Sequence, residues 1–231
     1  LPNRNDQSGT ENLALSTGGR WDILPGLSFE PQLSLYRVTD EGRTFQPSFQ
    51  NGAGPANLNT TRSATVTNSK WFQTQADAVL TYVKSFGSAH NVEAKAGYSY
   101  FGRKITAFSA SGQGAATDLI PTLNASATYQ LVTITITDQV ILGYFGRLNY
   151  DSRQRYLLTI NARYDGASNL GADNRWGFFP GIALGWNLHQ ERFWESVPSL
   201  VSRLKLRASY GVNGNISGLN DFQARGEYGL A

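Results

Sequence analysis

Long, regular alternation of apolar and polar residues is the feature that most restricts how this chain can fold. In residues 71–83 the even positions are mainly apolar, while Gln73, Gln75 and Asp77 occupy odd positions. Side chains of a β-strand point alternately to its two faces, so this run predicts a strand over 70–83 with one apolar and one polar face. Similar runs predict strands at 11–23, 27–39, 90–104, 138–150, 155–165, 176–188 and 203–211.

These runs are longer than the strands of most soluble proteins. Strands in globular proteins usually have about 5 or 6 residues. A strand that crosses a bilayer at a tilt needs about 9 to 11, with apolar side chains toward lipid and polar ones toward the lumen. The sequence has no stretch of about 18 apolar residues, which excludes helical membrane spans. We therefore predict an all-β chain that forms part of an antiparallel transmembrane β-barrel.

The composition agrees with this fold and narrows the function. Charged residues make up 16% of the chain and aromatic residues 12%, and there are 24 glycines, a balance typical of many strands and turns. The net charge of +3 is spread over single Lys and Arg residues without a basic stripe, so no nucleic-acid partner is expected. Without Cys, disulfides and thiolate metal sites are excluded. The polar start and the absence of Met indicate a mature, trimmed or internal piece, without a signal peptide.

The predicted connections alternate between short and long. Tight turns are expected at 24–26, 84–89 and 151–155, and long links at 40–69, 105–137, 166–175 and from 212 onward. Outer-membrane barrels have tight periplasmic turns and longer extracellular loops. The long links are therefore predicted to lie outside the cell.

Aromatic residues fall near the ends of the predicted strands, on the apolar face. This is the position of an interfacial girdle, where an amphipathic ring contacts both lipid and water. In the alternative fold, a soluble β-sandwich that acts as a binding module, these rings would fill the core, but shorter strands and more even turns would be expected. The residues concerned are Tyr144, Tyr150, Tyr156, Tyr164, Trp176 and Trp186.

Seven short elements follow one another in a fixed order in the second half of the chain. They are GRLNY (146–150), RYL (155–157), RYDGAS (163–168), RWGFFP (175–180), GW (185–186), ERFW (191–194) and LKLRASYGVNGN (204–215). This order resembles that of the SusC/RagA-type TonB-dependent outer-membrane transporters. Ala167 stands where that pattern has a serine, and Asn169 and Leu170 replace its usual Arg-Phe. The detailed resemblance covers about a third of the chain.

The resemblance implies both an architecture and a function. Complete barrels of this class have about 22 strands and a plugged lumen, whereas nine or ten strands and no plug or TonB-contacting segment are recognisable here. Residues 1–231 are therefore expected to be a segment of the barrel, in the outer membrane of a Gram-negative bacterium. The implied function is TonB-dependent import of oligosaccharides or peptides with a SusD-like surface lipoprotein, the TonB complex acting through the plug region. The alternative is a surface adhesion or structural barrel protein without transport.

No pattern in the sequence indicates an enzyme. His90 and His189 are the only histidines, and neither lies in a metalloprotease or serine-triad motif. Oxygen-bearing side chains in residues 165–174 could hold Ca²⁺, but they lack EF-hand spacing, and a solvated turn is the favoured interpretation. No other cofactor or metal is expected.

Candidate ligand-binding residues belong to two groups. One lies on polar strand faces, where the side chains would line the lumen and bind a polar solute or the plug, or alternatively form salt bridges that fix strand register. The other lies in the long links, where rings and amides suit a sugar or a peptide backbone, or alternatively an interface with the lipoprotein. The first group is Arg147, Asn161, Arg163 and Asp165, and the second is Phe45, Asn51, Asn59, Asn124 and Tyr129.

Overall fold

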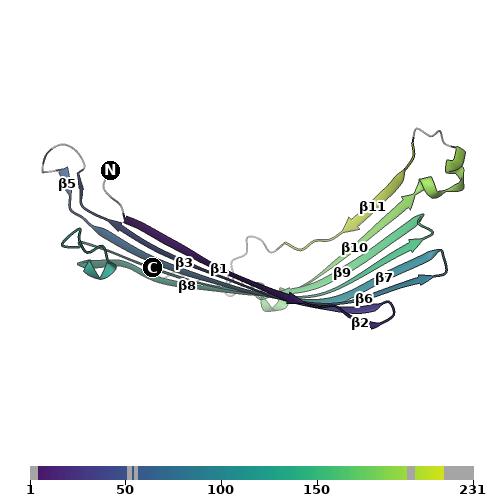
Figure 1. Cartoon of the computed structure of the whole chain (residues 1–231), viewed down its shortest axis with the longest axis horizontal. Helices are drawn as coiled ribbons and strands as arrows, with labels where there is room; N and C mark the ends of the chain where they lie inside the picture. Colours follow the sequence, from purple (N-terminus) through teal and green to yellow (C-terminus); the bar gives the residue numbers. More distant parts are fainter. Residues whose placement is uncertain (1–4, 51–53, 55–56, 197–200, 216–231) are drawn as a thin grey trace. The chain divides into compact units, whose positions relative to one another are not determined.

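The computed structural model of the chain describes residues 5–50, 54, 57–196 and 201–215. Within these ranges nine strands form one sheet in the order β1-β3-β6-β7-β8-β9-β10-β11, with β2 paired to β3 (Figure 1). Strands that follow one another along the chain are thus neighbours in the sheet, as in a meander. Their bounds are β1 Asn5–Gly18, β2 Trp21–Leu24, β3 Leu27–Gln46, β6 Ser63–Phe86, β7 His90–Gln113, β8 Thr128–Ser152, β9 Tyr156–Ala167, β10 Trp176–Asn187 and β11 Lys205–Gly211.

Short elements occupy the connections. β4 (Phe49–Gln50) and β5 (Leu58–Asn59) form a separate two-stranded sheet. The 3₁₀ helices are η2 (Leu123–Ala125), η3 (Ala172–Asn174), η4 (Leu188–Gln190) and η5 (Arg192–Ser196). None of the helices in the described ranges has the length and apolar character needed to cross a bilayer.

The predicted all-β antiparallel fold is confirmed, but several predicted boundaries are wrong. The links expected at 40–69 and 105–137 are largely strand, because β3, β6, β7 and β8 continue well past the predicted runs. Their extensions include stretches such as 63–69, SATVTNS, in which both faces carry small or polar residues and the alternation disappears. The run 11–23 is divided between β1 and β2, with Gly19 and Arg20 between them.

Contacts between Cα atoms divide the chain into two compact units. Unit 1 comprises Leu1–Leu15, Leu35–Gln73 and Arg103–Asp138, and unit 2 comprises Ser16–Ser34, Thr74–Gly102 and Gln139–Ala231. In unit 1, Phe45 packs with Ala64 and Ala115 in a small core, which Leu123 and Ala125 border.

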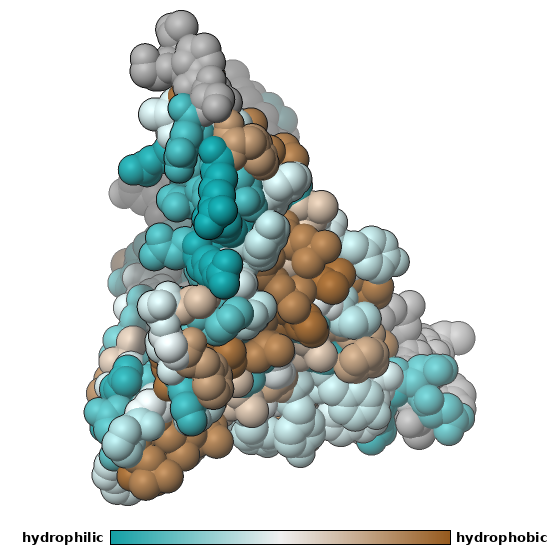
Figure 2. Space-filling model, turned by 90° about the vertical axis from the view of Figure 1, so that its right-hand side faces the viewer, coloured by the Kyte–Doolittle hydropathy of each residue, from teal (hydrophilic) through white to brown (hydrophobic). Residues whose placement is uncertain are grey.

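The register of unit 2 keeps the two faces of the sheet separate. Tyr150 on β8 lies opposite Leu158 on β9, which lies opposite Leu184 on β10. The apolar face is the more exposed one. On β10, Phe178 is 60% and Leu184 54% exposed, whereas Phe179 and Ala183, which point to the other face, are half-buried. Figure 2 shows hydrophobic residues gathered into patches beside hydrophilic ones. The aromatic residues therefore do not fill a sandwich core.

Stacked aromatic rings occur near both ends of the strands in unit 2. Tyr164 and Trp176 have ring centroids 4.9 Å apart, and Tyr156 and Trp186 have theirs 6.4 Å apart. The ten-residue step from Trp176 to Trp186 spans roughly 33 Å of strand, or about 25 Å of height at a tilt of about 40°. That height matches the apolar band of an outer-membrane barrel, about 25 Å.

Candidate functional site: a polar wall on β8, β9 and β10

A row of two aromatic rings and one guanidinium crosses the polar face of unit 2. Arg163 on β9 is in register with Phe145 on β8 and with Phe179 on β10. Its Cζ atom lies 5.8 Å from the centroid of the Phe145 ring, within the range of a cation–π contact. The register therefore builds a Phe-Arg-Phe row from residues that are 16 to 18 positions apart in the sequence.

Asp165 holds Arg163 from the next position on the same face. The Nε–H of Arg163 donates to both carboxylate oxygens, at 2.8 and 2.7 Å. The pair fits because glycines lie opposite it, and a Cβ at Gly143 would overlap the Asp165 carboxylate. The two side chains are 45% and 24% exposed, so the pair contributes little to stability and stays open to solvent or a ligand.

On the same face, a second polar network lies closer to the turn between β8 and β9. Arg147 donates from Nε to the Asn149 side-chain oxygen at 3.2 Å, and the Thr159 hydroxyl donates to the same oxygen at 2.9 Å. The Asn149 amide donates to Oε1 of Glu93 at 3.2 Å. These bonds connect β7, β8 and β9 through side chains, and whether Arg147 binds a solute or fixes strand register stays a prediction.

The predicted residues Asn161, Arg163 and Asp165 line one cleft of about 570 Å³. Phe179 and Asn213 line the same cleft, although neither is among the candidate residues predicted from the sequence. The ring of Phe179 lies against Gly177 and Gly214, where added Cβ atoms would overlap it. In the sequence, Phe179 stands out only as an aromatic residue at a position that the alternation of its strand assigns to the polar face.

The second group of predicted residues lies in unit 1, except Asn51, which lies outside the described residues. Phe45 is 4% exposed and belongs to the small core. Asn59 lies on β5 opposite Phe49, and its side-chain oxygen accepts the Thr61 backbone N–H at 2.8 Å. Asn124 and Tyr129 are exposed. A role of any of these residues in ligand binding stays a prediction.

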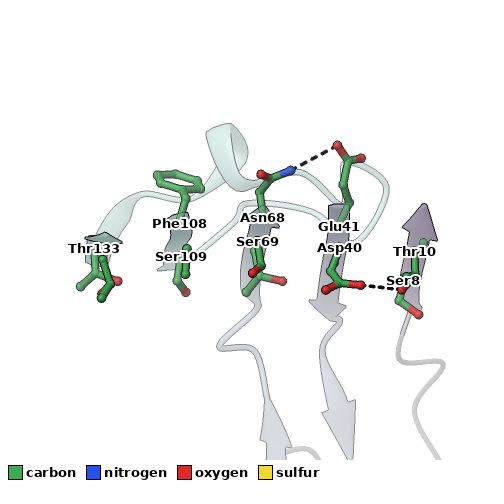
Figure 3. Close-up of a pocket in the computed structure, with 14 residues that line it drawn as sticks. Ser8, Thr10, Asp40, Glu41, Asn68, Ser69, Phe108, Ser109 and Thr133 are labelled. Atoms are coloured by element: carbon green, nitrogen blue, oxygen red, sulfur yellow. Dashed lines mark hydrogen bonds between the residues drawn. The ribbon is translucent and has the colours of Figure 1, made fainter. Parts of the chain in front are cut away.

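Unit 1 has a separate groove, of about 380 Å³, that is rich in small hydroxyl side chains. Figure 3 shows that Thr10, Asp40, Ser69, Ser109 and Thr133 come from neighbouring strands. The Thr10 hydroxyl donates to Oδ1 of Asp40 at 2.7 Å, and the Asn68 amide donates to Oε1 of Glu41 at 3.2 Å. Such a groove offers many hydroxyl donors and acceptors, together with the carboxylates of Asp40 and Glu41 and no basic side chain in its lining.

The Ca²⁺ hypothesis for residues 165–174 gains no support. Asp165 is paired with Arg163, and the Ser168 hydroxyl oxygen accepts the Val140 backbone N–H at 2.9 Å. Across the described part of the chain, no three His, Cys, Asp or Glu side chains are grouped to hold a metal.

Comparison with known proteins gives sequence relatives and similar structures. The chain is 30% identical over 200 residues to TonB-dependent receptor P3 of Formosa agariphila, covering 85% of this chain and 19% of that protein. It is 44% identical over 90 residues to TonB-dependent receptor SusC of Bacteroides thetaiotaomicron, covering 39% of this chain and 9% of the relative. The chain thus spans about a fifth or less of the length of these curated relatives. No protein-family model matches it.

Solved structures resemble the chain over nearly its whole length. A chain of the RagAB peptide transporter aligns with a TM-score of 0.85 at 19% identity, covering 94% of this chain and 24% of that one. The RagAB peptide importer in its open-open state aligns with a TM-score of 0.81, covering 90% and 22%. At this identity the likeness establishes the fold.

Proposed function

Because this chain belongs to the TonB-dependent receptors of the SusC and RagA type, we propose that it forms part of the wall of a barrel that imports oligosaccharides or peptides across the outer membrane. The wall closes with its backbone hydrogen bonds inside the sheet, since lipid offers no partners for them. The SusC relative and the RagAB structures support this proposal.

The separation of the two faces in unit 2 is the observation that carries the proposal. Large hydrophobic side chains are exposed on one face, while Arg147, Arg163 and Asp165 lie on the other. A sheet in water would bury its apolar face, because burial contributes about 25 cal/mol per Å². An exposed apolar face with a polar reverse face suits lipid on one side and a water-filled lumen on the other.

The proposed partners of the barrel are also those that the family suggests. We propose a SusD-like surface lipoprotein at the barrel end that carries residues 57–62 and 114–127. The energy for import would come from the TonB complex, which would act through a plug region and be driven by the proton gradient of the inner membrane. The host would be a Gram-negative bacterium with the protein in its outer membrane.

Deletion of the native gene tests the proposal. The mutant and its complemented strain are grown on single oligosaccharides and on peptides as the only carbon source, with and without a functional TonB complex. The proposal expects the gene deletion and TonB loss to abolish growth on the same solute. Normal growth of the deletion mutant on every solute, with altered adhesion to surfaces, would favour the non-transporting barrel instead.

A further inference from the structure

Phe179 is held in place on the polar wall of unit 2 by close backbone contacts. Added Cβ atoms at Gly177 and Gly214 would lie 2.5 Å from Cζ of the ring or closer, so two backbone segments support it. Phe145 lies in the same way against Gly97, but Arg163 stands over its ring at 5.8 Å. Phe179 lines the cleft of about 570 Å³.

Neutral, planar hydrogen-bonding groups share the cleft with this ring. Asn161, Asn174 and Asn213 line the same cleft, together with Arg163 and Asp165. The pairing of Arg163 with Asp165 cancels its charge locally and uses the Nε donor, so the Nη donors remain for a ligand. A site that combines an apolar ring with amides and a neutralised ion pair does not select for charge.

We propose that Phe179 is the stacking platform of a subsite for one neutral pyranose ring of an oligosaccharide. The C–H face of the sugar would lie on the phenyl ring, as apolar surfaces do on aromatic side chains. Its hydroxyls would bond to the Asn161 amide and to the Arg163–Asp165 pair, which together offer both donors and acceptors. This inference rests on the proposed function and names a substrate class for it.

A peptide fits these groups less well. A peptide terminus or charged side chain would gain from an unpaired charge, and Arg163 is already engaged by Asp165 at 2.7 Å. An extended peptide backbone pairs best with an open strand edge, whereas Asn161 and Phe179 lie on strands that have neighbours on both sides. Sugar hydroxyls both donate and accept, so they can pair with the carboxylate, amide and guanidinium groups of this cleft.

Binding measurements on purified variants test the proposal. The protein is expressed from its native gene, extracted in detergent, and titrated by calorimetry with neutral hexasaccharides of glucose, mannose and xylose and with a neutral hexapeptide. Phe179→Ala should weaken binding of the preferred saccharide about 10-fold or more, equivalent to about 1.4 kcal/mol, because the apolar face of the sugar would lose its contact with the ring. Phe179→Trp should restore the affinity to within about 2-fold.

Phe178→Ala is the matched control, because Phe178 is the neighbouring residue, lies on the opposite face of the sheet and is 60% exposed. It should leave the affinity for the saccharide unchanged. Heat-dependent migration in gels checks that each variant is folded, and the Trp variant provides a test if the Ala variant is not. Equal affinities of wild type and Phe179→Ala, preference for the hexapeptide, or no binding of any saccharide would each overturn the proposal.

The growth experiment on the gene deletion separates this inference from the proposed function. Loss of TonB-dependent growth on peptides alone would support import while overturning the sugar subsite. Saccharide binding that depends on Phe179, with growth unaffected by the deletion, would support the subsite while overturning import.

Discussion

The indole N–H of Trp186 donates a hydrogen bond to Oε1 of Glu191 at 3.0 Å. The same oxygen accepts the Tyr156 hydroxyl at 2.8 Å, and Arg155 pairs with Oε2 at 3.3 Å. The two rings stack with centroids 6.4 Å apart. The hydrogen bonds from Trp186 and Tyr156, with the nearby Arg155 charge, hold the pKa of Glu191 below its usual value. One carboxylate thus fixes two rings at one end of the apolar band.

Replacing Glu191 with alanine should destabilise this end of the barrel. The Trp186 and Tyr156 donors would lose their shared charged acceptor, so the free energy of unfolding should fall. Urea unfolding in lipid vesicles, followed by tryptophan fluorescence, measures the change in the free energy of unfolding. Glu195→Ala is the control, since Glu195 is exposed nearby on η5. If both variants lose the same stability, the Glu191 contacts have no special role.

Gly97 is needed because the Phe145 ring occupies the place where a Cβ would be. Gly97→Ala should therefore cost about 1–3 kcal/mol through overpacking. Gly146→Ala is the matched control, because its Cβ would meet only the Lys95 carbonyl oxygen, at 3.8 Å. That change should be neutral or stabilise by about 0.5–1 kcal/mol, since alanine restricts the unfolded chain more than glycine does. Both values come from denaturant unfolding, and a costly Gly146→Ala would contradict the assigned packing.

Where the alternation of residues was strong, the sequence predicted the strands closely. The predicted run 176–188 corresponds to β10, Trp176–Asn187, because every second residue there is apolar or aromatic. The prediction was poor for β6, which begins at Ser63 instead of 70. Its first residues are small and polar on both faces, so their strand conformation comes from pairing with neighbours and leaves no periodic signal.

The candidate site was predictable only in part, for a similar reason. Alternation alone put Asn161, Arg163 and Asp165 on one face. It could not reveal that Phe179 lies opposite Arg163, because the register depends on pairing between strands and turn length. The support of the ring by Gly214, which is distant in sequence, also depends on the folded backbone.

Asp118 should make the stability of the connections around Ser48, Arg62 and Asp118 in unit 1 sensitive to acid. Arg62 donates to its carboxylate at 2.6 Å, and the Ser48 hydroxyl and backbone N–H donate at 2.6 and 2.8 Å. These bonds, first from Arg62 and then from Ser48, hold the pKa of Asp118 well below its usual value. A lowered folded-state pKa gives stability that is complete above about pH 4 and is lost as the pH falls through the folded-state value.

Hydrogen exchange of residues 47–50, 57–62 and 114–127 measures this effect between pH 7 and pH 3. Protection, corrected for the intrinsic pH dependence of exchange, should fall below about pH 4 in the wild type. Asp118→Asn should show the lower protection already at pH 7 and little further change. Asp6→Asn serves as a control elsewhere in unit 1. An identical pH dependence in wild type and Asp118→Asn would show that another group is responsible.

Ile160 and Asn161 are adjacent residues that test the orientation of the sheet. Ile160 is 43% exposed, midway between Tyr156 and Tyr164 on the apolar face, and opposite Leu148 and Ile182. An arginine there would enter hydrocarbon near the bilayer midplane, so Ile160→Arg should cost about 2–4 kcal/mol in a refolding titration in vesicles. Asn161→Arg, on the face assigned to the lumen, should cost less than half as much because its charge stays in water. Equal costs would mean that lipid does not cover the apolar face, and the barrel assignment would fail with it.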